Sequence, residues 1–259
     1  MPTQPVLFVA HGSPMLAVEP DAWGAALGRW AADLRDLKAV LVVSAHWEAP
    51  APIGITSAAA PGTLHDFGGF PERLYTLQYP APGDPALAAR VLDLLTAAGI
   101  PARLDPDRPR DHGAWVPLMN LRPQADLPVL QLALPRPRSP RQLFELGQAL
   151  RPLRAEGVLI VGSGGIVHNL GRLDWNGGGA PAPWAQGFAD WVGERLERGA
   201  FTELIDGCAG APGFQWAVPT TEHFDPLFLT LGAADGSPAV RIFDGWQLGS
   251  LSLATWAFA

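Results

Sequence analysis

Histidine is the residue type whose placement in this sequence most strongly suggests chemistry. The chain has six: His11, His46, His65, His112, His168 and His223. Three of them follow continuously apolar runs that are typical of buried strands, namely VLFVA, VLVVSA and VLIVG. Imidazole is a common nitrogen ligand for zinc and non-haem iron, and it titrates near neutral pH. A convergent set would let three rings hold a metal with open positions while the others transfer protons.

The local context of the histidines supports one shared site. A glycine follows His11 in AHGSP and His112 in DHGAWVPL, where we expect a helix to begin. His168 comes after the turn GSGGIV, whose glycines let the backbone approach a ligand closely. His223 lies in TTEHFDPL at an expected helix start, and His65 lies in HDFGGFP, a loop rich in glycine and aromatic residues. An isolated histidine is usually a packed core or surface residue. The prediction of one site therefore rests on the local context that several of these histidines share.

The segments that must position these side chains alternate between strand-like and helical patterns. Expected strands cover residues 6–10, 39–45, 53–56, 74–79, 129–133, 157–162, 240–243 and 251–258. Expected helices cover residues 21–34, 84–98, 140–153, 183–198, 201–205 and 223–231. The alternation predicts an α/β fold, a single-domain α/β/α sandwich over residues 1–259 around a mixed, largely parallel sheet. Ligands of such sheets lie outside the carboxyl ends of the strands, where the histidines are expected.

Composition excludes several classes of protein. Apolar residues make up 48% and charged residues 17% of the 259 residues, which favours a packed core over disorder. The net charge of -7 argues against a nucleic-acid partner, and no run of apolar residues is long enough to predict a membrane span. The first residues lack the features of a signal peptide, and Cys208, the single cysteine, allows neither an internal disulfide nor a multi-thiolate zinc site. We therefore expect a cytoplasmic location.

Other catalytic motifs are weak or missing. Residues 162–165 (GSGG) resemble a phosphate-binding turn, but the sequence has neither GxGxxG nor GK[ST]. Neither Ser13 nor Ser163 lies in a GxSxG motif, so a serine hydrolase is not supported. HExxH, the common zinc-protease motif, does not occur.

Six short motifs, taken in order, resemble a known family. HGSP, SAHWE, HDFGGFP, DHGAWVPL, GSGGIVHNL and TEHFDPL are similar to those of the DOPA-dioxygenase-type class III extradiol aromatic ring-opening dioxygenases. The resemblance runs from His11 to about Asp225. It implies a single-domain α/β fold and a non-haem iron(II) centre. It also implies catechol substrates whose ring is cut beside, and not between, the two hydroxyls.

Matching motifs imply roles for five histidines. His11, His46 and His223 would hold the metal. His168 would act as the acid/base, and His112 would line the substrate or oxygen position.

Some of these assignments have alternatives. The third ligand in the wider superfamily is often a carboxylate, and Glu222 stands beside His223. His65 would lie at the pocket mouth, in contact with substrate, or make a fourth metal contact. Four aromatic residues flank the histidines and are candidates for the wall around a flat substrate, with core packing as the alternative for each: Trp47, Trp115, Phe67 and Phe70.

The expected reaction takes a small aromatic diol and O2 as substrates in a monomer or homodimer. We expect iron(II) for activity, although Zn²⁺ can occupy the same imidazole ligands. Two alternatives from other classes stay open: a zinc-dependent hydrolase that activates a bound water, and a non-catalytic metal-binding protein on the same fold.

Overall fold

Strands from both ends of the chain contribute to the sheet. The computed structural model describes residues 3–19, 21–175 and 180–259. The strands are β1 (Val6–Ala10), β2 (Ala39–Ala49), β3 (Ile53–Thr56), β4 (Ala102–Asp105), β5 (Val129–Pro135), β6 (Val158–Gly164), β7 (Ala239–Phe243), β8 (Trp246–Gln247), β9 (Leu251–Ser252) and β10 (Thr255–Phe258). The α-helices are α1 (Ala22–Ala32), α2 (Pro85–Ala97), α3 (His112–Leu121), α4 (Pro140–Leu150), α5 (Pro152–Ala155), α6 (Pro183–Glu197), α7 (Phe201–Gly207), α8 (Phe214–Ala217) and α9 (Asp225–Ala233). Short 3-10 turns are η1 (Pro14–Ala17), η2 (Glu72–Leu74), η3 (Leu170–Arg172) and η4 (Cys208–Gly210).

The eight-stranded sheet has the order β4-β3-β5-β2-β6-β1-β10-β7. Its centre is parallel, because β5, β2, β6 and β1 all run in the same direction. β10 and β7 add antiparallel pairings at one edge, and β3 pairs antiparallel with β5 on the other side. The mixed, largely parallel sheet predicted from the sequence is confirmed. β8 and β9 form a separate hairpin.

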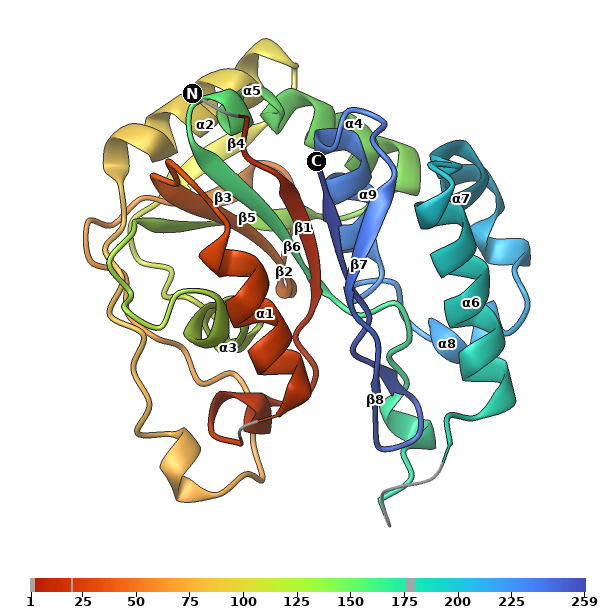
Figure 1. Ribbon diagram of the computed structural model, residues 1–259. Coiled ribbons are helices and arrows are strands. Elements are labelled where there is room, and N and C mark those ends of the chain that lie inside the picture. Colours follow the sequence, from red (N-terminus) through yellow and green to blue (C-terminus); the bar gives the residue numbers. More distant parts are fainter. Residues whose placement is uncertain (1–2, 20, 176–179) are drawn as a thin grey trace.

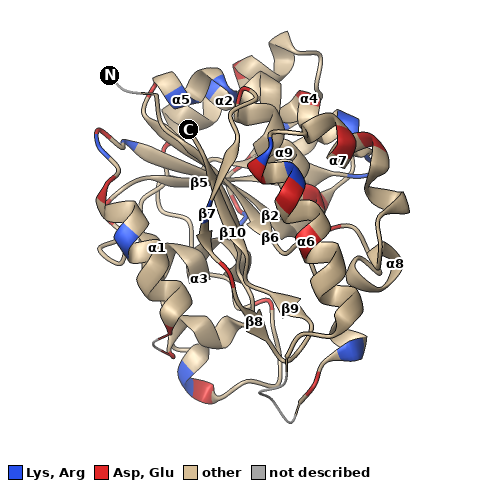
Figure 2. Ribbon diagram, turned by 45° about the vertical axis from the view of Figure 1, so that its right-hand side comes forward, with Lys and Arg blue, Asp and Glu red and all other residues tan. Residues whose placement is uncertain are grey.

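Alternate residues of the central strands face two different cores. Leu7 and Val9 pack with Trp23 and the rest of the layer formed by α1 and α3. Phe8 points to the other face, where it packs in the layer that contains Phe228 of α9. Figure 1 shows α1 and α3 on one side of the sheet and α6 and α7 on the other. In Figure 2 charged residues lie mainly on the outer helices and loops, which agrees with a sheet buried on both faces.

Local sequence accounts for several helix ends. Asp21 accepts a hydrogen bond from the Gly24 amide at 2.8 Å and begins α1. Ser139 and Gln142 form a capping box at the start of α4. The expected helix over 140–153 is interrupted between α4 and α5, because Pro152 restricts the residue before it and lacks an amide proton.

One expected strand is wrong and two were missed. Residues 74–79 form no strand, because side chains satisfy part of this backbone: the Tyr79 amide donates to Thr63 Oγ1 at 3.0 Å, and the Tyr79 carbonyl accepts from Arg110 at 2.9 Å. The missed strands are β4, which lies at the edge of the sheet and has exposed central residues, and β8, which has only two residues. The last expected strand divides into β9 and β10. Within the described ranges, no helix combines the length and apolarity that a membrane span requires.

Candidate metal centre and active site

Five of the six histidines line one cavity of about 470 Å³ at the carboxyl ends of the central strands. They are His11, His46, His112, His168 and His223. Ring centroids of neighbouring histidines in this group lie 3.4–5.5 Å apart. The sequence-based expectation of a convergent site therefore agrees with the geometry.

His11 and His46 come from the ends of β1 and β2, the two strands that flank β6 in the sheet. His11 directly follows β1, and its amide donates to the Gly164 carbonyl at the end of β6. His46 lies inside β2 and not beyond it as expected, because the strand continues to Ala49. The pairing of β2 with β5 shifts register between Val43 and Glu48, a local irregularity of the kind that re-aims a side chain. The two Nε2 atoms come within 3.0 Å of each other.

His223 reaches the cavity from the segment just before α9. The Gly165 amide donates to the His223 carbonyl at 2.8 Å. A Cβ atom at Gly164 would lie 2.0 Å from that carbonyl oxygen, so only glycine permits this approach. The GSGG sequence thus serves close packing between β6 and the His223 segment.

Hydrogen bonds fix which ring nitrogen carries the proton in two of these histidines. The Ser163 hydroxyl donates to the Gly113 carbonyl, so it must accept from His11 Nδ1, which lies 2.9 Å away. Glu222 Oε1 lies 3.0 Å from His223 Nδ1, and this hydrogen bond lowers the pKa of Glu222 to about 2. The ionised carboxylate can only accept. His11, whose pKa is held well below 6.5, consequently carries a lone pair on Nε2, and in His223 the Nδ1 atom is the donor to Glu222.

These nitrogens fit a metal cation. The ligand atoms of His11, His46 and His223 all lie within 4.8 Å of one another. His223 Nε2 is buried and has no hydrogen-bond partner among the described residues. Burial and the neighbouring histidines hold the pKa values of His11 and His46 well below 6.5, so both rings are neutral, as metal binding requires. A cation between the nitrogens would supply the partner that the buried Nε2 of His223 lacks among the described residues.

Among the residues that the structure describes, two other groups of donors are close enough to hold a metal, one containing Asp66 and one containing Glu222. In both groups the carboxylate already accepts a hydrogen bond from an imidazole: Asp66 from His112, and Glu222 from His223. Each carboxylate therefore orients a histidine ring. Glu222, the alternative third ligand considered from the sequence, orients His223 in this way.

His168 lies flat against His223, with ring centroids 3.4 Å apart and planes 6° from parallel. It follows β6 and pairs with Leu251 in an isolated bridge. Burial, together with the nearby His223, lowers the pKa of His168 to about 3. Its ring is therefore neutral at neutral pH.

His112 is the first residue of α3, and Asp66 holds it there. Asp66 Oδ1 accepts from the His112 amide and from His112 Nδ1, both at 2.9 Å. Burial alone would raise the pKa of Asp66, but the His112 hydrogen bonds outweigh it and lower the pKa to about 2. Asp66 Oδ2 lies 3.6 Å from His46 Nδ1. Sequence analysis missed Asp66, although it stands next to His65 in HDFGGFP.

Three residues expected to contact substrate do not line the cavity, and these placements are corrected. Trp47 packs in the opposite core against Gly54, because successive strand residues face opposite sides and His46 already faces the cavity. Trp115 is fully buried in α3, and its indole nitrogen donates to the Leu64 carbonyl at 2.9 Å. His65 Nε2 lies 3.0 Å from the Leu77 carbonyl and outside the cavity, which removes it as a fourth metal contact.

The aromatic residues of the HDFGGFP loop do line the cavity. Phe67 and Phe70 both form part of its wall, with ring centroids 5.4 Å apart. Phe67 also lies edge-on to His112, at a centroid distance of 5.5 Å.

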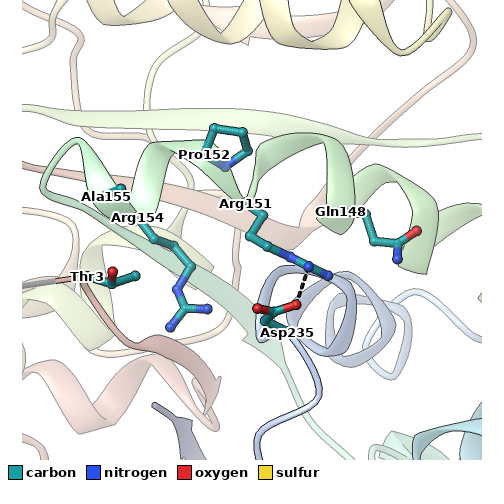
Figure 3. A pocket seen from close by; sticks show the side chains of 7 residues that line it. All are labelled: Thr3, Gln148, Arg151, Pro152, Arg154, Ala155 and Asp235. Atoms are coloured by element: carbon teal, nitrogen blue, oxygen red, sulfur yellow. Dashed lines mark hydrogen bonds and ion pairs between the residues drawn. The ribbon is translucent and has the colours of Figure 1, made fainter.

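A separate hollow of about 380 Å³ lies beside α5, away from the histidines. Figure 3 shows its lining side chains, with Arg151 paired to Asp235. Arg154 donates to the carbonyls of Gln4 and Ala233 at 2.7 and 3.0 Å. These contacts tie the amino-terminal segment to α5 and the end of α9, so the arginines of this hollow have structural partners.

Comparisons with known proteins agree with this geometry. A family model described as the catalytic LigB subunit of aromatic ring-opening dioxygenase matches residues 5–248. The chain is 40% identical to a 4,5-DOPA dioxygenase extradiol of Escherichia coli K12, covering 96% of this chain and 92% of that protein. It is also 40% identical to a protein of the same name from Beta vulgaris, with 97% and 95% covered. A crystal structure of an uncharacterized protein from Escherichia coli K12 superposes with a TM-score of 0.85 at 35% identity, covering 99% of this chain and 100% of that one.

Proposed function

This chain belongs to the family of the catalytic LigB subunit of aromatic ring-opening dioxygenase, and we propose that it uses O2 to open a catechol-type ring beside its two hydroxyls. It is thus an oxidoreductase of the extradiol dioxygenase class. The observation that carries the proposal is the 40% identity to proteins named 4,5-DOPA dioxygenase extradiol across nearly the whole chain. The convergence of neutral imidazoles on one cavity supports it independently.

His11, His46 and His223 are the residues that would hold the metal, with iron(II) as the ion for activity. When bound, iron(II) would supply the electron relay between the catechol and O2, which zinc cannot provide because it has no redox chemistry. Ser163 and Glu222 would keep the Nε2 lone pairs of His11 and His223 directed at the ion.

We assign proton transfer to His168. Its ring, which lines the cavity and stacks on His223, would accept a proton from a hydroxyl oxygen of the bound catechol. The same nitrogen would return a proton to an oxygen atom of the product as the ring opens. A general acid/base of this kind contributes a factor of about 10²–10⁴ to the rate.

His112 would line the part of the cavity that receives the substrate or O2. Because Asp66 accepts from its Nδ1, the group left for the substrates is Nε2. Phe67, edge-on to His112, would limit where the flat ring can lie. A cytoplasmic location and a monomeric or homodimeric state remain predictions of the sequence.

The test is anaerobic reconstitution with iron(II), followed by addition of a catechol and air. We expect oxygen uptake and a yellow product of the muconic semialdehyde type, with DOPA and protocatechuate among the first compounds tried. Hydrolysis of an ester or amide by the zinc-loaded protein, without oxygen uptake after iron loading, would instead support the zinc-dependent hydrolase. Inactivity of both forms toward a broad catechol panel would favour a non-catalytic metal-binding protein.

A further inference from the structure

A buried arginine joins the two chain segments that carry His46 and His223. Arg138 lies between β5 and α4, and its side chain is 7% exposed. Its Nη1 donates to Glu48 Oε1 at 2.6 Å, and its Nε donates to Asp225 Oδ2 at 2.6 Å. Glu48 stands two residues after His46 in β2. Asp225 stands two residues after His223 and begins α9. The guanidinium therefore connects close neighbours of two of the three proposed metal ligands.

On the His223 side the arginine contacts a closed turn. The Asp225 amide donates to the Thr221 carbonyl at 2.9 Å, and the Thr221 hydroxyl donates to Asp225 Oδ2 at 2.8 Å. These two bonds close the turn that contains His223. The Asp225 side chain is 5% exposed, so Arg138 and Thr221 take the place of water around its carboxylate. A shift of Asp225 would consequently move the turn and the His223 ring with it.

On the His46 side the arginine contacts the irregular end of β2. The pairing of β2 with β5 shifts register between Val43 and Glu48, the stretch that contains His46. Arg138 Nη1 also donates to the carbonyl of Pro135, the last residue of β5, at 3.1 Å. Arg138 thus ties Glu48 to the end of β5 just beyond the irregularity.

One guanidinium serves both carboxylates. Hydrogen bonds between a guanidinium and a carboxylate are strong, and a carboxylate that loses its cation inside a protein is strongly destabilised. Arg136 Nη1 also reaches Glu48 Oε2 at 3.2 Å, but its side chain is 68% exposed, where an ion pair contributes little. Arg138 is therefore the group that sets the distance between Glu48 and Asp225.

We propose that Arg138 is a positioning residue of the metal centre, which fixes the separation of His46 and His223. The inference rests on the metal ligands named under the proposed function. Arg138 is not part of the cavity lining, so it acts through the backbone of the two segments that it joins. Ligands already held at the right spacing bind a metal more tightly, because none of the binding free energy is spent on ordering them.

The test measures zinc affinity and stability separately. Zn²⁺ is the probe, titrated into metal-free protein in competition with a chromophoric chelator, and the Tm of the metal-free protein reports stability. Arg138→Met should raise the Kd for zinc by about 10–100-fold, the usual effect of losing a residue that orients a metal ligand. Arg138→Lys should recover only part of this loss, because an ammonium is a single point charge and cannot direct separate donors at two carboxylates.

Arg154→Met is the matched control for stability. Arg154 is also a buried arginine, 4% exposed, but it donates to the carbonyls of Gln4 and Ala233 and lies outside the histidine cavity. Its loss should lower the Tm of the metal-free protein. The Kd for zinc should change by no more than about twofold, the scatter expected for sites that act independently.

Glu48→Gln tests the bridge from the His46 side and decides the question if Arg138→Met does not fold. This change removes the charge of a side chain that is 22% exposed and keeps an acceptor for Arg138. The Kd for zinc should rise by about tenfold. Combined with Arg138→Met, it should add little, because the two residues share one interaction.

The outcomes separate this inference from the function on which it rests. A Kd for zinc within about twofold of the wild type in Arg138→Met, or in Glu48→Gln if only that variant folds, would overturn the inference. An equal rise of the Kd in Arg154→Met would also overturn it, since the effect would then follow general stability. Zinc affinity that His223→Ala leaves unchanged would overturn the proposed ligands and the inference together. Absence of oxygen uptake by the iron-loaded wild type with every catechol would overturn the dioxygenase function alone, because the zinc titrations need no turnover.

Discussion

Nε2 of His11 and Nε2 of His46 approach to 3.0 Å, although the protonated Nδ1 of His11 is already bonded to Ser163. His11 Nε2 therefore presents a lone pair to its neighbour. Together with the unpartnered Nε2 of His223, this geometry describes a site arranged around a positive charge.

Loss of a ligand should remove the metal. We expect His223→Ala to lower iron and zinc content to background, because it deletes one of three nitrogens that lie within 4.8 Å of one another. His65→Gln is the matched control, since His65 lies outside the cavity and glutamine retains a donor for the Leu77 carbonyl. Metal analysis of the purified variants gives the answer. Full metal content in His223→Ala would contradict the assignment.

Loss of the acid/base should spare the metal. His168→Ala should retain metal while kcat falls by about 10²–10⁴-fold, the usual effect of a missing general acid/base. The measurement is kcat with 4-methylcatechol together with metal content on the same sample. A parallel loss of metal and activity would make His168 a ligand, in the group that it forms with Glu222 and His223 within 4.8 Å.

Asp66 should act through His112. Asp66→Asn keeps the shape of the side chain but replaces the carboxylate that accepts from His112 Nδ1 by a neutral amide. We expect kcat to fall by about 10–100-fold. In a His112→Ala background the same change should cost little more, because the two residues share one interaction. Steady-state kinetics of the two single variants and the double variant test this. Additive losses would show that Asp66 works independently of His112.

The close approach at Gly164 should be sensitive to one methyl group. A Cβ there would lie 2.0 Å from the His223 carbonyl, so Gly164→Ala should lower the free energy of unfolding by about 1–3 kcal/mol and weaken metal binding. Gly187→Ala is the control, since nothing lies within 4 Å of a Cβ at that position in α6. Helix propensity predicts a gain of about 0.5–1 kcal/mol there. Urea unfolding and metal titration compare the two, and unaltered metal affinity in Gly164→Ala would count against this role.

The identity of the metal should decide activity. Imidazole ligands do not reject zinc, which ranks above iron(II) in the general order of affinities, so protein purified in air is expected to carry some zinc. Zinc-loaded enzyme should show no oxygen uptake with a catechol, and chelation followed by iron(II) should restore it. An oxygen electrode makes the comparison on one batch of protein. Equal rates in both forms would rule out an iron-dependent electron relay.

The sequence by itself determined the local structure and the edge of the sheet at which the site lies. Continuous apolar runs such as VLFVA predict strands covered on both faces, and Asp21 and Ser139 mark helix starts through bonds to residues only three positions away. Because parallel strands end at the same edge of a sheet, histidines placed just beyond such runs could be expected to meet. His11 and His168 follow this rule.

Tertiary structure decided which neighbours each side chain meets. Ser163 is 152 residues from His11 and Asp66 is 46 residues from His112, so neither partner could be identified from local pattern. The choice between Asp66 and His65, one position apart, depends on how a loop with no repeating pattern lies across α3. Likewise Trp47 faces the core only because β2 continues through His46 and alternation sends the next side chain to the opposite face. Periodicity and capping are properties of adjacent residues, whereas strand order, tautomer and cavity lining depend on contacts between segments far apart in the chain.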